Sequence, residues 1–337
     1  MMKNRLIISL LLLAIVVPAC KKSDPGGGMP SPSPYMRLVE SKGTNAEGEV
    51  IWKDSAFYIG ENVSELRRYN NDPLDGFIEY QRDEMEYPDQ NTIVKTEYEI
   101  NPNTLELDPR SRSTFILDNG LLAEQLNHES YNNQWYDVSM VAYTYDDGLL
   151  REITSRWFDI NTWVEMVKIT FIYNSEDLER IILFLNDENN WIEDAKWEYF
   201  YQTGRIKQCI LSRYDEGSME WNPYFRYDID YEAHLVSSTQ FYEYDSVLSQ
   251  WEYMGERSYD YDNQGILLSE RRFSAENGHI SFTDHTYEPG QGNYEQIYQQ
   301  DATLFIPWMP FPTYALIRHP ASGIRLSTPN PTIFPKP

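Results

Sequence analysis

The chain has 337 residues, and its 28 Lys and Arg against 53 Asp and Glu give a formal net charge of −25. This acidity excludes a nucleic-acid binder, which needs a basic face. Aromatic residues make up 15% of the chain, too many for a disordered acidic polymer, and two cysteines cannot form a disulfide scaffold. The composition predicts a folded protein with a packed core and identifies no specific activity.

The first 19 residues have the features of a signal peptide. Lys3 and Arg5 precede an apolar run at residues 6–17, which is too short to span a bilayer and suits the apolar region of such a peptide. The run ends in Val17-Pro18-Ala19-Cys20, which resembles a bacterial lipobox despite the unusual proline. The resemblance implies acylation of Cys20; an ordinary cleaved signal with an unrelated cysteine is the alternative.

Residues 20–34 carry the lipidated Cys20 and then a segment dominated by Gly, Pro and Ser. Such a segment has no apolar periodicity and is typical of a tether, which can extend over about 45–50 Å. Position 21 is Lys rather than the Asp that retains such proteins in the inner membrane. We therefore expect an outer-membrane lipoprotein on the periplasmic face or the cell surface, with the membrane as a partner through the N-terminal lipid.

An internal repeat organises the middle of the chain. Five tryptophans recur at intervals of 28, 28, 30 and 30 residues, a tyrosine stands ten residues after each, and an aliphatic residue stands five residues after each tyrosine. The tryptophans are Trp135, Trp163, Trp191, Trp221 and Trp251, the tyrosines Tyr145, Tyr173, Tyr201, Tyr231 and Tyr261, and the aliphatics Leu150, Leu178, Ile206, Val236 and Ile266.

Each unit has the pattern of a β-hairpin. Between tryptophan and tyrosine the apolar residues alternate, as in Trp163, Val167, Ile169, Phe171 and Tyr173, so we expect these rings on one covered face of a strand. Turn residues follow the tyrosine, for example at positions 146–148 (Asp-Asp-Gly), and reverse the chain.

The frame Tyr-x-Tyr-Asp-x-x-Gly-x-Leu, best seen at residues 259–267, resembles the YD-type repeats of Rhs-like proteins. It is similar to the tandem hairpin repeats of lipid-anchored proteins in Bacteroidota and covers roughly residues 107–290. Copies at 174–177 and 232–235 lack the turn glycine. The resemblance implies an architecture rather than an activity, and encapsulation of a toxin is not carried over because the large toxin regions are absent.

The predicted fold class is all-β, an antiparallel meander of tandem 28–30-residue hairpins with about 12–16 strands. Because its aromatic face needs cover, the sheet should curl or close like a barrel rather than stay flat. We divide the chain into a signal peptide (1–19), the tether (20–34), an N-terminal β cap (35–106), the hairpin repeat domain (107–300) and a Pro-rich C-terminal arm (301–337).

No sequence pattern indicates catalysis, a cofactor or a metal site. The five histidines lack metal-ligand spacing, and Cys209 has the pattern of a small buried residue. Acidic pairs such as Asp146 with Asp147 fall at turns or on polar faces, where solvation explains them, although they leave a glycosidase open. A calcium site at the turn 262–265 lacks the ligand number of a dedicated loop.

We therefore expect a non-catalytic, lipid-anchored cell-envelope protein that serves as a structural or interaction module with a protein or glycan partner. The alternative is a glycan-binding lipoprotein of a nutrient-uptake system, and a glycan-active hydrolase ranks last. For the repeat tryptophans, core packing is preferred to ligand stacking. The tryptophans outside the repeat, Trp52, Trp157 and Trp308, are the better candidates for ligand contact.

Overall fold

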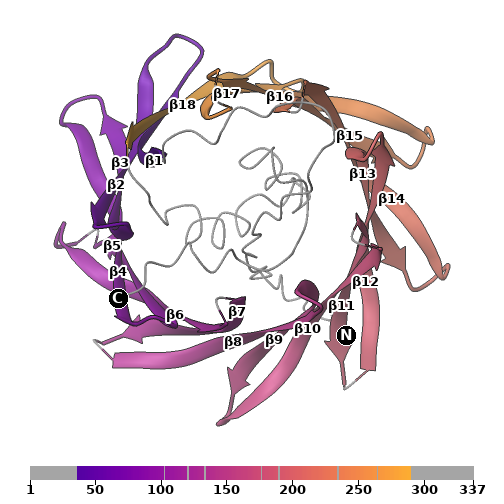
Figure 1. The fold of residues 1–337 in the computed structure, drawn as a ribbon, viewed down its shortest axis with the longest axis horizontal. Coiled ribbons are helices and arrows are strands. Elements are labelled where there is room, and N and C mark those ends of the chain that lie inside the picture. The colour runs from indigo at the N-terminus through magenta and orange to yellow at the C-terminus, as the bar shows by residue number, and fades with distance from the viewer. Residues whose placement is uncertain are drawn as a thin grey trace.

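The computed structural model describes residues 36–289 except 102, 120, 133, 176, 189, 234 and 264. These residues form one sheet of eighteen antiparallel strands, in which each strand pairs with the next in sequence and β1 also pairs with β18 (Figure 1). The predicted all-β antiparallel meander is confirmed, and the sheet closes into a barrel. The strand number exceeds the expected range because the residues before 107 supply five regular strands, β1 to β5.

The strands follow one another with short turns. Their bounds are β1 Met36–Thr44, β2 Val50–Ile59, β3 Asn62–Asp72, β4 Gly76–Asp89, β5 Thr92–Ile100, β6 Leu107–Asp118, β7 Leu121–Tyr131, β8 Gln134–Asp146, β9 Leu149–Asp159, β10 Thr162–Asn174, β11 Asp177–Asp187, β12 Asn190–Gln202, β13 Arg205–Asp215, β14 Glu220–Glu232, β15 Leu235–Asp245, β16 Gln250–Tyr261, β17 Leu267–Ser274 and β18 Ile280–Pro289.

The turns after the tyrosines use left-handed backbone conformations, as two-residue hairpin turns require. Asp147 and Gly148 have φ values of 50° and 73° in the turn between β8 and β9. Where the repeat lacks the glycine, Ser175 and Ala233 adopt φ values of 58° and 53°. The hairpin geometry therefore holds across the repeat even where the preferred turn residue is missing.

A β-bulge follows each of these turns, and a tyrosine hydroxyl compensates for it. In β9 the register shifts so that Arg151 is an extra residue, which disrupts the ladder next to Leu150. The hydroxyl of Tyr173 then donates a hydrogen bond to the carbonyl oxygen of Leu150, 2.9 Å away. Equivalent bonds of 2.6–3.0 Å join Tyr58 to Leu38, Tyr87 to Val63, Tyr145 to Leu122, Tyr201 to Leu178 and Tyr231 to Ile206.

This tyrosine row includes two members, Tyr58 and Tyr87, that lie in the segment expected to be an irregular cap. The cap residues therefore continue the architecture of the repeat even though they lack its tryptophans. At the other end of the repeat, Tyr261 pairs with Leu267 rather than with Ile266, because the turn there is one residue longer. Leu267 is buried, as the aliphatic position requires.

One face of the closed sheet holds the core, and we call it the inner face because a concave face crowds its side chains together. Its residues include Leu150, Leu178 and Ile229, each 0% exposed. From β9 to β15 the inner face is mainly apolar, and we call this part the apolar arc. From β16 through β1 to β5 it carries charged and hydroxyl side chains, which form the polar arc: Arg257, Glu270, His285, Ser41, Asp54, Arg68, Asp83 and Lys95.

Candidate interaction surface

The five repeat tryptophans lie on the outer face, opposite the tyrosine row, so the expectation of a shared face is wrong. Trp163 pairs with Phe158 on β9, whereas Val167 pairs with Ser155, and the side chains of Ser155 and Phe158 point to opposite faces. The cause is a second β-bulge, at Met166, which adds one residue between Trp163 and Val167 and reverses the alternation.

The same bulge recurs three residues after every repeat tryptophan. The extra residues are Val138, Met166, Asp194, Tyr224 and Met254. Each tryptophan is consequently separated from the core by the thickness of the sheet. Trp135 is 37% exposed, and the other four are of intermediate exposure.

Together with their cross-strand neighbours, these tryptophans form an outer aromatic row near one rim of the barrel. Neighbouring rings lie 5.0 Å apart at Phe158 and Trp163, 5.2 Å at Tyr214 and Trp221, and 5.1 Å at Tyr244 and Trp251. Such tilted ring pairs are favourable beyond the area that they bury.

Cations from the preceding hairpin cover parts of this row. The ammonium of Lys168 lies 4.6 Å from the ring centre of Trp191, and that of Lys196 lies 4.9 Å from Trp221. The guanidinium of Arg226 lies 5.3 Å from the ring centre of Trp251. The row therefore presents aromatic faces, cations and the nearby carboxylate of Glu198, which pairs with Lys196 at 2.9 Å, on one continuous surface.

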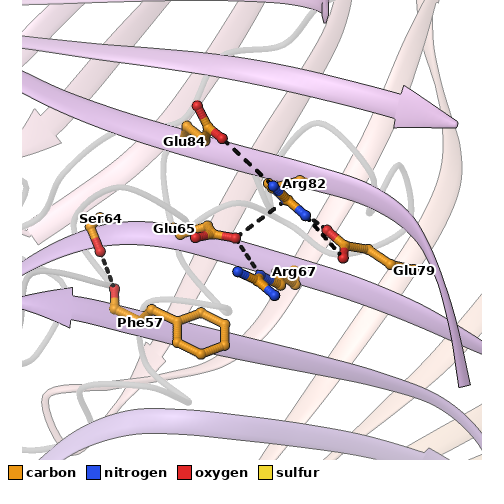
Figure 2. A network of polar contacts seen from close by, with 7 residues as sticks. All are labelled: Phe57, Ser64, Glu65, Arg67, Glu79, Arg82 and Glu84. Atoms are coloured by element: carbon orange, nitrogen blue, oxygen red, sulfur yellow. Dashed lines mark hydrogen bonds and ion pairs between the residues drawn. The ribbon is translucent and has the colours of Figure 1, made fainter. Parts of the chain in front are cut away.

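Elsewhere on the outer face, charged side chains pair with one another across neighbouring strands. Arg82 on β4 contacts Glu79 at 2.7 Å and Glu65 at 3.3 Å, and it lies 3.9 Å from Glu84 (Figure 2). Arg67 on β3 pairs with Glu65 in the same network. Because these side chains alternate with the inner ones along β3 and β4, the network spans the outer wall from strand to strand.

The tryptophans expected to contact ligands do not join this row. Trp52 pairs with Gly43 on the inner face, where its ring occupies the space that a side chain at position 43 would need. Trp157 pairs with the buried Ser139, also on the inner face, and both tryptophans are half-buried. Trp308 and Cys20 lie outside the described residues. The repeat tryptophans, for which core packing was the preferred expectation, are the ones that lie on the outer face.

In the polar arc, a serine, a histidine and a glutamate from three neighbouring strands lie next to one another. Ser41 Oγ lies 2.9 Å from His285 Nδ1, and His285 Nε2 lies 3.4 Å from Glu270 Oε1. Acyl transfer would also require free backbone N–H groups to stabilise an oxyanion. Ser41 sits within a strand that pairs on both sides, with His285 and with Asp54, so its surroundings support a structural role.

Two carboxylates lie beside Arg68 on this arc. Asp83 is 0% exposed, and its Oδ2 accepts a hydrogen bond from Arg68 at 3.1 Å. Burial raises the pKa of Asp54 to about 6. The nearby charge of Asp83 also raises this pKa, whereas the charge of Arg68 lowers it. Asp54 therefore takes up a proton in a pH range where an ordinary Asp stays ionised.

Among the described residues, no group of three His, Cys, Asp or Glu side chains could hold a metal ion. Cys209 is fully buried on the inner face, and burial raises the pKa of its thiol well above the usual value. Such a thiol is a poor nucleophile. Within the ranges that the structure describes, no helix is long and apolar enough to cross a membrane.

No family model matches the chain, and no curated protein matches it. Among solved structures, the chain is distantly similar to a porin-like protein from Bacteroides uniformis, with 14% identity and a TM-score of 0.39 over 77% of this chain and 100% of that one. A DUF3836 family protein from Bacteroides vulgatus has 10% identity and a TM-score of 0.24 over 26% of this chain and 89% of that one.

A third similarity is to TcdB2-TccC3, with 11% identity and a TM-score of 0.26. The match covers 72% of this chain and only 16% of that much longer one. All three are distant structural similarities between β-proteins, and none assigns the chain to a family.

Proposed function

We propose that the protein is a non-catalytic, lipid-anchored component of the cell envelope whose barrel works as an interaction module. The observation that carries this proposal is the outer aromatic row, in which the bulge after each tryptophan turns a large ring away from the core. If these rings served only stability, the apolar arc on the inner face would be the more favourable place for them.

The charges of the outer wall support an aqueous position for the barrel body. Arg156 pairs with Glu165 at 3.0 Å and Arg226 with Asp228 at 3.1 Å on this face. A Lys or Arg that faces lipid at the middle of a bilayer costs about 2–4 kcal/mol. Attachment through acylated Cys20 and the tether at residues 20–34 reconciles a water-facing wall with a membrane location.

The anchoring is tested by the substitution Cys20→Ser in the full chain. We expect the wild-type protein to incorporate radiolabelled palmitate and to sediment with the outer membrane, whereas the variant does neither. Membrane sedimentation that survives the loss of Cys20 would refute lipid anchoring. It would leave the interaction role of the barrel to a separate measurement.

That measurement is binding through the outer aromatic row. The double variant Trp191→Ala with Trp221→Ala removes two rings from the row, and Trp197→Phe changes a ring on the inner face as a matched control. Photo-crosslinking at the row in intact cells should yield a discrete partner that the double variant loses and the control keeps. Loss in both variants or in neither would contradict the proposal.

A glycan is the second candidate partner, because aromatic faces stack on the apolar C–H faces of sugar rings and neighbouring charged groups bond their hydroxyls. A glycan array with the purified protein tests this directly. We expect a hit to weaken at least tenfold in the double variant. An array without any hit would favour the protein partner.

A further inference from the structure

Among the residues that the structure describes, two pairs of arginines face each other directly across neighbouring strands, and carboxylates surround only one of these pairs. Arg67 and Arg82 are opposite one another on the outer face, and Arg257 and Arg272 are opposite one another between β16 and β17 on the inner face. Like charges in such positions repel. Glutamates at positions 65, 79 and 84 surround the outer pair and offset its charge (Figure 2).

The inner pair has no comparable set of carboxylates among the residues that the structure describes. Arg257 is only 7% exposed, and its Nε has no hydrogen-bond partner within the described part of the chain. Its guanidinium lies 5.7 Å from the ring centre of Phe241. The nearest acidic residue along the same face of β17, Glu270, directs its carboxylate to His285 Nε2 at 3.4 Å.

A buried guanidinium is strongly unfavourable unless a counter-charge accompanies it. Residues at the same level of the wall add polar groups, since the buried Thr239 is directly opposite Arg257 and Ser281 is directly opposite Arg272. Two guanidinium groups with hydroxyls beside them supply the kind of N–H and O–H donors that an oxyanion accepts.

We propose that Arg257 and Arg272 form an oxyanion-binding site on the inner wall of the barrel, with Thr239 as a further donor. The ligand carries a phosphate, sulfate or carboxylate group, either as a free inorganic ion or as the charged group of an acidic oligosaccharide. The site is separate from the outer aromatic row, so it stands or falls independently of the proposed function.

The test compares the melting temperature of the full chain in detergent with sodium phosphate and with potassium chloride at equal ionic strength. We expect phosphate to raise the melting temperature of the wild type and of Arg271→Gln, whose side chain lies on the outer face opposite Ser258. The rise should disappear in Arg272→Gln, an exposed position that tolerates substitution, and in Arg257→Met. Calorimetric titration should show the affinity of Arg272→Gln for phosphate falling about tenfold or more.

A second arm replaces phosphate with trigalacturonic acid. Tighter binding of the sugar than of phosphate assigns the site to an acidic glycan, and tighter binding of phosphate assigns it to a free ion. In chloride alone, Arg257→Met should melt at a higher temperature than the wild type, because it removes the buried charge. An equal response to phosphate in all four proteins, or no response to either probe in the wild type, overturns the proposal.

Discussion

The inner and outer faces of the barrel are built from the same eighteen strands, yet the same repeat supplies them with different chemistry. On the inner face, tyrosine hydroxyls bond to backbone carbonyls that a bulge removes from the ladder, and aliphatic residues such as Leu178 pack around them. On the outer face, tryptophans stack with cations and partner rings at the surface. The single extra residue that follows each tryptophan, rather than residue type, therefore decides which aromatic ring becomes part of the core.

Deletion of Asp194, the extra residue in β12, should have the largest effect on the difference between the two faces. Without it, the alternation would carry Trp191 to the inner face or displace the residues after it to the outer face, because a slip of one residue reverses every side chain. We expect a loss of about 4 kcal/mol or more in the free energy of unfolding. The control Asp194→Ala keeps the residue number, and urea denaturation should find it close to the wild type.

The next largest effect is expected for Leu178→Ala on the inner face. Leu178 is 0% exposed, so its truncation should cost about 2–5 kcal/mol of unfolding free energy. Ile182 lies nearby on β11 but points to the outer face, and Ile182→Ala should cost about 1 kcal/mol. Equal losses for the two variants in denaturant titrations would show that the faces do not differ in packing.

The variant Asp54→Asn tests whether stability at the inner face depends on pH. The pKa of Asp54 is raised to about 6 in the folded protein, so the folded state holds this proton more tightly than the unfolded state does. The free energy of unfolding therefore falls as pH rises from about 4 to about 6. At pH 7 the variant should be more stable by about 1–3 kcal/mol, and the difference should vanish below a pH of about 4.

The outer-face counterpart of that variant is Glu65→Gln, which removes a carboxylate paired with two arginines. This change should lower stability slightly at pH 7, which is the opposite sign. Melting curves between about pH 4 and pH 7.5 decide the matter. A pH-independent difference for Asp54→Asn would contradict the assignment.

Among the changes on the inner face, the smallest effect is expected for Tyr201→Phe, which removes one hydroxyl and keeps the ring. The carbonyl of Leu178 then loses its donor, 2.8 Å away, inside the barrel wall. We expect a cost of about 1–2 kcal/mol. The matched change Tyr214→Phe on the outer face, at a ring that stacks on Trp221, should be nearly neutral in the same unfolding assay.

Much of the architecture could be predicted from the chain. The spacing of Trp163 and Tyr173, the alternation between them and the turn residues after Tyr145 all act over a few neighbouring residues, so they predict hairpins in series. The members Tyr58 and Tyr87 were missed, although Val63 stands five residues after Tyr58 as in the repeat. That aliphatic spacing could have revealed Tyr58, whereas the residue five positions after Tyr87 is Thr92.

The face of the tryptophans could not be predicted, because the residues that form the bulge share no chemistry. Val138, Asp194 and Tyr224 are aliphatic, acidic and aromatic, so no residue type marks the place where the alternation reverses. The inner arginine site was missed for a related reason. Arg257 and Arg272 are fifteen residues apart and meet only through the register of β16 and β17.

Because strand and turn preferences are local, the amino-acid sequence alone predicts that this protein folds as antiparallel hairpins. The pairing of β1 with β18, the outward position of the tryptophans and the shared inner wall of charged residues distant in the chain emerge from the folded structure. Those features depend on the pairing register of all eighteen strands. Each extra residue in a strand moves the side chains after it from one face of the sheet to the other.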